Sequence, residues 1–255
     1  MELYLRETPK ERKKAAYESA LAVLSHGKNR VFLTVAALAC IAVSFVCYFV
    51  LWAASLIFYD AAVGNASFLV WFATEALFVL LLWLLAAPLW LGMYRMAHGM
   101  MCGKTTDMGD FFAYIGDARM YLRSLRMSWR LLVRWLPVWV GYLAFQMFFA
   151  YDIVGVLLVV FLMIASVLSL ALVSGIGGFL TLAVSDDKMS LVDAAERSCE
   201  LIAGERMRVL GYDLLMFLRL ALSLVPIGIP FLLQMLPLSM LCAAAYSERL
   251  AAREM

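Results

Sequence analysis

Four ionisable side chains fall inside long apolar stretches of the sequence, where an uncompensated charge is costly. They are Glu75, Arg134, Asp213 and Arg219. At helical rise, Glu75 and Arg219 each lie about 10 Å from the outer end of their stretch, whereas Arg134 and Asp213 lie within about 6 Å of the inner ends. We favour a structural ion pair for Glu75 with Arg219, and a transport or ligand site is the alternative. Arg134 and Asp213 fit a second pair or extension to the headgroups.

No catalytic or metal-binding pattern accompanies these charges. The sequence has no serine nucleophile elbow, zinc-protease motif or dinucleotide fingerprint. His26 and His98 have no neighbours at metal-ligand spacing, so we predict neither a metal nor a cofactor site. The polar residues that could support a membrane enzyme are better explained as helix caps and a solvated face. They are Asp107, Asp110, Asp117 and Arg119. We therefore expect a protein that is not an enzyme.

Two groups of glycines predict close helix packing. The segment GMMCGKT from Gly99 resembles a phosphate-binding loop, but it has one residue too few between its glycines and no preceding strand. We interpret Gly99 and Gly103 as a small-residue contact between helices. A second group marks a close contact or a bend: Gly175, Gly177 and Gly178.

The composition excludes an ordinary soluble domain. Of the 255 residues, 65% are hydrophobic and 16% are charged, and the mean hydropathy is +0.88. Soluble domains are about half apolar and about a quarter charged. Because a span needs about 20 residues, the chain suits an all-α bundle of about six transmembrane helices. The apolar runs predict spans at 31–59, 68–91, 131–150, 153–184, 209–225 and 230–246.

The positions of the cations predict the orientation of these spans. None of the 21 Lys and Arg residues lies in the gaps 60–67, 151–152 and 226–229. By the positive-inside rule, the N-terminal segment 1–30, the linkers 95–130 and 185–208, and the tail 248–255 are cytoplasmic. The fifth span is the weakest because it holds Asp213 and Arg219. As a re-entrant segment it would place the C-terminus outside.

The predicted cytoplasmic segments carry helix-start signals. Thr8, Pro9 and Glu11 predict a capped helix over the N-terminal segment. Its basic residues predict contact with anionic inner-leaflet headgroups, although a solvated helix that leads into the first span fits equally well. They are Lys10, Arg12, Lys13 and Lys14. Asp107 and Ser190 predict N-caps of amphipathic interfacial helices, one in each linker.

Three stretches carry a resemblance to a known family. They are 13–24, a basic helix that feeds the first span; 88–112, which contains Pro88, Gly92 and Lys104; and 190–246, which contains Asp193, Gly204 and a PIGIP turn. Together they are similar to the bacterial multi-pass membrane family catalogued as domain of unknown function 975. Leu236-Pro237-Leu238 departs from the family pattern, which tends to have Pro followed by Tyr. The resemblance implies a bacterial cytoplasmic (inner) membrane protein of about six helices and brings no catalytic residues.

Two functions fit these observations. The first is a non-enzymatic accessory, regulatory or lipid-interacting membrane component, with membrane lipids, a protein partner or a second copy of the chain as partners. The second is a small transporter, channel or lipid-handling protein that uses a polar site at Glu75 and Arg219. A changed flux in Glu75→Gln would favour the second. We expect no nucleic-acid partner.

Overall fold

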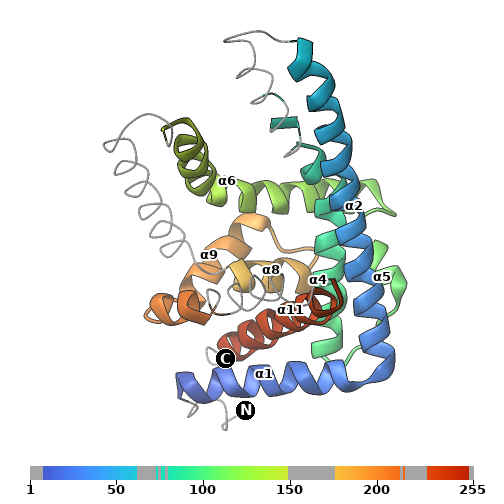
Figure 1. Ribbon diagram of the computed structural model, residues 1–255. Coiled ribbons are helices and arrows are strands. Elements are labelled where there is room, and N and C mark those ends of the chain that lie inside the picture. Colours follow the sequence, from blue (N-terminus) through green and yellow to red (C-terminus); the bar gives the residue numbers. More distant parts are fainter. Residues whose placement is uncertain are drawn as a thin grey trace.

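The computed structural model describes residues 8–61, 73, 76–77, 80–148, 176–212, 215 and 229–252. Within these residues the regular elements are helices and no strand occurs, which confirms the all-α class (Figure 1). The elements are α1 (Pro9–Ser25), α2 (Gly27–Ala61), the π-helical turn η2 (Leu82–Ala86), α4 (Ala87–Met101), α5 (Met108–Phe112), α6 (Ala118–Phe148), α8 (Ile176–Ser185), α9 (Leu191–Leu201) and α11 (Ile229–Ala251).

Helix starts follow the local sequence. Thr8 caps α1 in a reciprocal capping box with Glu11, and Asp107 caps α5 in the same way with Asp110. Ser190 caps α9 by accepting a hydrogen bond from the Asp193 amide. The three predicted N-caps are therefore confirmed. Each one satisfies backbone donors that the first turn of a helix leaves without a partner.

Helix α2 is long and apolar enough to cross a membrane, by length and composition, over Gly27–Val50. It is the one such helix among the residues that the structure describes. Only 28% of the most apolar part of α2 is buried inside the protein. Large apolar side chains of this helix, such as Phe45, Phe49 and Trp52, are exposed. In Figure 1, α1 lies across the lower end of α2.

The other predicted spans are described in part. Most of the fourth and fifth predicted spans lies outside the described residues, whereas 80–91 of the second predicted span is described and includes η2 and the start of α4. The predicted third span and the end of the linker before it form one continuous helix, α6, which begins at Ala118. The predicted sixth span corresponds to α11, which contains Pro237 and continues to Ala251.

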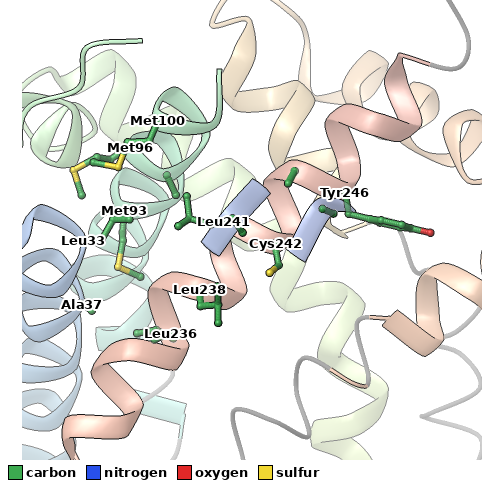
Figure 2. Packing of buried hydrophobic residues seen from close by; sticks show 14 of the residues in the cluster. Leu33, Ala37, Met93, Met96, Met100, Leu236, Leu238, Leu241, Cys242 and Tyr246 are labelled. Carbon is green, nitrogen blue, oxygen red and sulfur yellow. The ribbon is translucent and has the colours of Figure 1, made fainter. Parts of the chain in front are cut away.

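The larger hydrophobic core lies where α1, α2, α4 and α11 meet. Figure 2 shows Leu33 of α2, Met93 of α4 and Leu241 of α11 gathered in this core, and all three are fully buried. On α1, the same face that carries Ala16 and Ala20 is buried in it. The apolar face of the N-terminal helix therefore contacts protein.

A second core joins α4, α6, α8 and α9. Tyr94, Tyr114, Met127, Phe179 and Ala194 are buried together in it. Three glycines allow close contacts between the helices that form the two cores. A Cβ added to Gly92 of α4 would overlap the carbonyl oxygen of Phe111 in α5. On α8, a Cβ at Gly177 would lie 3.1 Å from Ser247 Oγ of α11, and one at Gly178 would lie 3.6 Å from Ser198 Cβ of α9.

Candidate functional site: a basic groove beside α6

A groove of about 1010 Å³ lies between α6, η2 and the turn that joins α8 to α9. We call it the α6 groove. Its cationic lining residues are Arg119, Arg123, Arg126, Arg130 and Lys188. Its carboxylates are Asp117 and Asp187. Its apolar and other residues are Trp83, Met120, Leu122, Leu125, Trp129, Met189, Ser190 and Leu191. Five cations against two carboxylates give the groove a positive charge that favours an anionic occupant.

One stripe of α6 alternates arginines with exposed apolar side chains. Arg119, Arg126 and Arg130 share this helix face with Leu122 and Trp129, because the five positions recur at steps of three and four. Leu122 is 53% exposed and Trp129 is 52% exposed. A helix face that contacts only water typically carries polar residues, and a face packed in a protein core typically carries apolar ones. This stripe of α6 carries both. The combination is typical of a helix at a membrane interface.

The wall opposite this stripe is formed in part by η2. Trp83 donates a hydrogen bond from its indole Nε1 to the carbonyl oxygen of Leu125 at 3.0 Å, and its ring lies 5.5 Å from the Trp129 ring. Tyr121 donates its hydroxyl to the carbonyl oxygen of Leu84 at 2.8 Å. These contacts attach α6 to the chain that precedes α4, so the tryptophan pair has a defined position in the groove.

Arg123 fixes the third wall. Its guanidinium donates to the carbonyl oxygens of Met189, Ala183 and Asp186, each at 3.0 Å. These carbonyls lie at the end of α8 and in the following turn, where helix geometry leaves acceptors unpaired and where a cation is favourable. Arg123 therefore holds the α8–α9 turn against α6. Ser190, the N-cap of α9, is positioned at the groove by the same contact.

One of the two groove carboxylates is already neutralised. Asp187 forms an ion pair with Arg95 of α4. The Nη1 of Arg95 donates to both carboxylate oxygens of Asp187, each at 3.0 Å. Burial is the largest single effect and lowers the pKa of Arg95, but the interactions with Asp187 and Tyr114 together raise it above its ordinary value. Within the described residues, no ion pair involves Arg119, Arg126 or Arg130. These three guanidiniums and the exposed Lys188 ammonium are the charges that the groove offers.

The predicted basic cluster on α1 divides between two environments. Lys10 and Lys14 are exposed, and Lys13 lies 5.9 Å above the Tyr212 ring. Arg12 differs from the prediction of headgroup contact. Its side chain is 4% exposed, and Nη2 lies 2.7 Å from Glu205 Oε1. The buried arginine lies on the same helix face as Ala16, which explains why it is turned toward protein.

Of the predicted intramembrane charges, Glu75, Asp213 and Arg219 lie outside the described residues, as does Gly175. Arg134 belongs to the helical backbone of α6. Gly99 contacts Thr106, since an added Cβ would lie 2.7 Å from the threonine methyl. Gly103 has a left-handed backbone (φ 70°) and ends α4, and a Cβ there would meet nothing within 4 Å. Gly103 is therefore a helix terminator, not the predicted packing residue.

The prediction that His98 has no neighbours suitable for a metal is wrong. Cys102, the C-cap of α4, follows His98 by one helical turn, and α11 brings Glu248 to the same point. His98 Nε2 lies 2.6 Å from Glu248 Oε1 and 3.6 Å from Cys102 Sγ. A hydrogen bond from His98 holds the pKa of Glu248 below its ordinary value. The spacing of His98 and Cys102 was visible in the sequence, whereas the approach of Glu248 was not.

Comparisons with family models, with curated proteins and with solved structures find no match to this chain. The resemblance to the family of unknown function 975 therefore remains a prediction.

Proposed function

We propose that the chain is a six-span protein of the bacterial inner membrane that is not an enzyme and that binds anionic phospholipid through the α6 groove. In this proposal the protein is an accessory or regulatory membrane component, with both termini in the cytoplasm. The observation that carries it is the α6 stripe, where Arg119, Arg126 and Arg130 alternate with exposed Leu122 and Trp129.

A phospholipid supplies a partner for both kinds of side chain in the α6 stripe, the arginines and the exposed apolar residues. Its phosphate accepts hydrogen bonds from arginine, which binds phosphate oxygens in a two-pronged geometry. Its acyl chains cover the apolar side chains, and tryptophan is favoured at the level of the headgroups. A free phosphate ion would satisfy the arginines but leave Leu122 and Trp129 in water. These requirements favour a lipid over a soluble anion.

The membrane setting has separate support. Large apolar side chains of α2 are exposed over much of its length, and contiguous apolar surface of this kind is rare on soluble monomers. The predicted orientation assigns the linkers that contain the α6 arginines and Lys188 to the inner leaflet, where anionic lipids attract basic residues.

The test is quenching of tryptophan fluorescence by brominated lipids in vesicles that contain the full chain. We expect brominated phosphatidylglycerol to quench Trp129 more than brominated phosphatidylcholine does, and Trp129→Phe to remove that component. Arg126→Gln should weaken the preference about fivefold, because a cation near the surface contributes about 1 kcal/mol. The matched control is Arg197→Gln, which removes an exposed α9 arginine outside the groove.

Two results would overturn the proposal. One is equal quenching by the two lipids, and the other is the same loss in Arg197→Gln as in Arg126→Gln. Competition by soluble glycerophosphoglycerol, which has the headgroup without the acyl chains, distinguishes binding of a lipid from binding of a free phosphate ester. If it displaces the lipid at similar concentration, the groove binds free phosphate esters and the lipid assignment is wrong.

A further inference from the structure

Three potential metal ligands from two helices converge at the junction of α4 and α11. They are the imidazole of His98, the thiol of Cys102 and the carboxylate of Glu248, and their ligand atoms all lie within 4.8 Å of one another. His98 lies in the last turn of α4 and Cys102 is the C-cap of that helix, four residues later, so both side chains point from one face. Glu248 comes from the last turns of α11.

We propose that His98, Cys102 and Glu248 bind a divalent cation of the Zn²⁺ class, with water in the fourth position. Nitrogen, sulfur and carboxylate oxygen are the three ligand types that Zn²⁺ takes from proteins, and three protein ligands with one open position is a common arrangement. This site is separate from the α6 groove, and its existence does not depend on lipid binding.

The distances fit a tetrahedral ion after a small adjustment. With Zn–S of about 2.3 Å and Zn–N of about 2.0 Å, a tetrahedral site places sulfur and nitrogen about 3.5 Å apart. Cys102 Sγ and His98 Nε2 are 3.6 Å apart, close to this value. Nitrogen and oxygen ligands would lie about 3.3 Å apart. The 2.6 Å contact between His98 and Glu248 must therefore widen as the ion replaces the shared proton.

The fold holds the ligands from two sides. Cys102 is the last residue before Gly103, whose left-handed backbone ends α4 in a Schellman motif. In this motif the Gly103 amide donates to Met100 and the Lys104 amide donates to Gly99. His98 is buried, with a side chain 5% exposed, whereas Cys102 is exposed and Glu248 is 43% exposed. An ion can therefore reach the site from solvent and find the imidazole already positioned.

A purely structural His98–Glu248 ion pair would not need the thiol, so Cys102 distinguishes the two explanations. Co²⁺ is the probe, because a thiolate bound to Co²⁺ gives a charge-transfer absorption band in the near ultraviolet. The full chain is purified in detergent, treated with chelator and titrated with Co²⁺. We expect a band that saturates at one ion per chain and that Zn²⁺ abolishes.

The matched variants are Cys102→Ser and Cys199→Ser, because both cysteines are exposed and only Cys102 belongs to the cluster. We expect the band to disappear in Cys102→Ser and to persist in Cys199→Ser. A wild-type chain without the band would overturn the proposal, as would a band that survives in Cys102→Ser.

Thermal unfolding gives an independent measurement. Because a ligand that binds only the folded state stabilises it, Zn²⁺ should raise the Tm of the wild type. Glu248→Gln should lower the Zn²⁺ affinity by at least about tenfold, as loss of a ligand is at least as damaging as loss of a second-shell partner. An unchanged affinity in Glu248→Gln would exclude the carboxylate from the site. The Tm of each variant without metal establishes that it is folded.

Discussion

At the scale of single residues, the buried ion pair between Arg12 and Glu205 ties the start of the chain to the segment after α9. Both side chains are less than a tenth exposed, and Nη2 of Arg12 lies 2.7 Å from Oε1 of Glu205. Removal of Arg12 leaves the buried Glu205 carboxylate with a longer ion-pair contact, to the Arg208 guanidinium at 4.0 Å. This loss is more destabilising than replacement of both Arg12 and Glu205 by apolar groups. We therefore predict that the effects of substituting Arg12 and Glu205 on the free energy of unfolding are not additive.

Arg12→Met should lower the free energy of unfolding by about 3 kcal/mol, because the Glu205 carboxylate stays buried. The double variant Arg12→Met with Glu205→Met should recover much of this loss. Lys10→Met, on an exposed neighbour, should have little effect. The measurement is thermal or denaturant unfolding in detergent. Additive losses in the double variant would contradict this interpretation of the pair.

Gly92 is a second residue whose identity the structure requires. Gly92→Ala should destabilise the protein by about 2 kcal/mol, because the new methyl would overlap the backbone of Phe111 and separate α4 from α5. Gly211→Ala is the matched control, since nothing lies within 4 Å of the added carbon. In a helix this control should be neutral or stabilising by up to about 1 kcal/mol. Equal Tm values for the two variants would contradict the close approach.

At the scale of helices, local signals were sufficient to predict where several elements begin. The caps at Thr8, Asp107 and Ser190 depend on residues within three positions of each other. Such interactions are independent of the rest of the fold. Gly103 at the end of α4 is also a local signal. A glycine that ends a helix and a glycine that allows two helices to pack closely cannot be told apart from the sequence.

Thr8→Ala should destabilise the start of α1 by about 1 kcal/mol, because the first turn loses its cap. Hydrogen exchange of the α1 amides measures the change. The hydrogen bond from the Thr8 amide lowers the pKa of Glu11 below its ordinary value of 4.5. The bond that the Glu11 carboxylate accepts from the Thr8 amide therefore contributes fully above the ordinary pKa of Glu11 and is lost as the pH falls through the lowered one. Protection in α1 that is insensitive to both changes would contradict the capping box.

Contacts between distant elements could not be predicted. The partners Glu205, Asp187 and Glu248 lie 193, 92 and 150 residues from Arg12, Arg95 and His98. No periodicity encodes such distances, because they depend on how helices pack. The α6 arginines illustrate the limit. Their positions gave the predicted orientation, but their alternation with Leu122 and Trp129 becomes a groove only when Trp83 and the α8–α9 turn supply the other walls.

At the scale of the whole molecule, the proposed topology brings the lipid groove, the metal ligands and α1 to the cytoplasmic side of the membrane. In Figure 1, α1, α11, α8 and α9 lie toward one end of α2. The exposed apolar surface of α2 continues away from them, with Phe45, Phe49 and Trp52 along its length. Among the described residues, α1, α8, α9 and α11 therefore pack near one end of α2, and the rest of α2 exposes apolar side chains. This arrangement is expected if α2 crosses the bilayer and the packed helices lie on its cytoplasmic side.

The exposed cysteines allow this topology to be measured directly. Cys40, Cys47 and Cys242 are buried, so Cys102→Ser leaves Cys199 as the one exposed cysteine among the five. This variant is treated with a membrane-impermeant maleimide in intact spheroplasts and in inside-out vesicles. Ser67→Cys, in a predicted outer gap, is the control for the opposite side. We predict that Cys199 reacts only in the inside-out vesicles, whereas Cys199 labelled in intact spheroplasts would contradict the account.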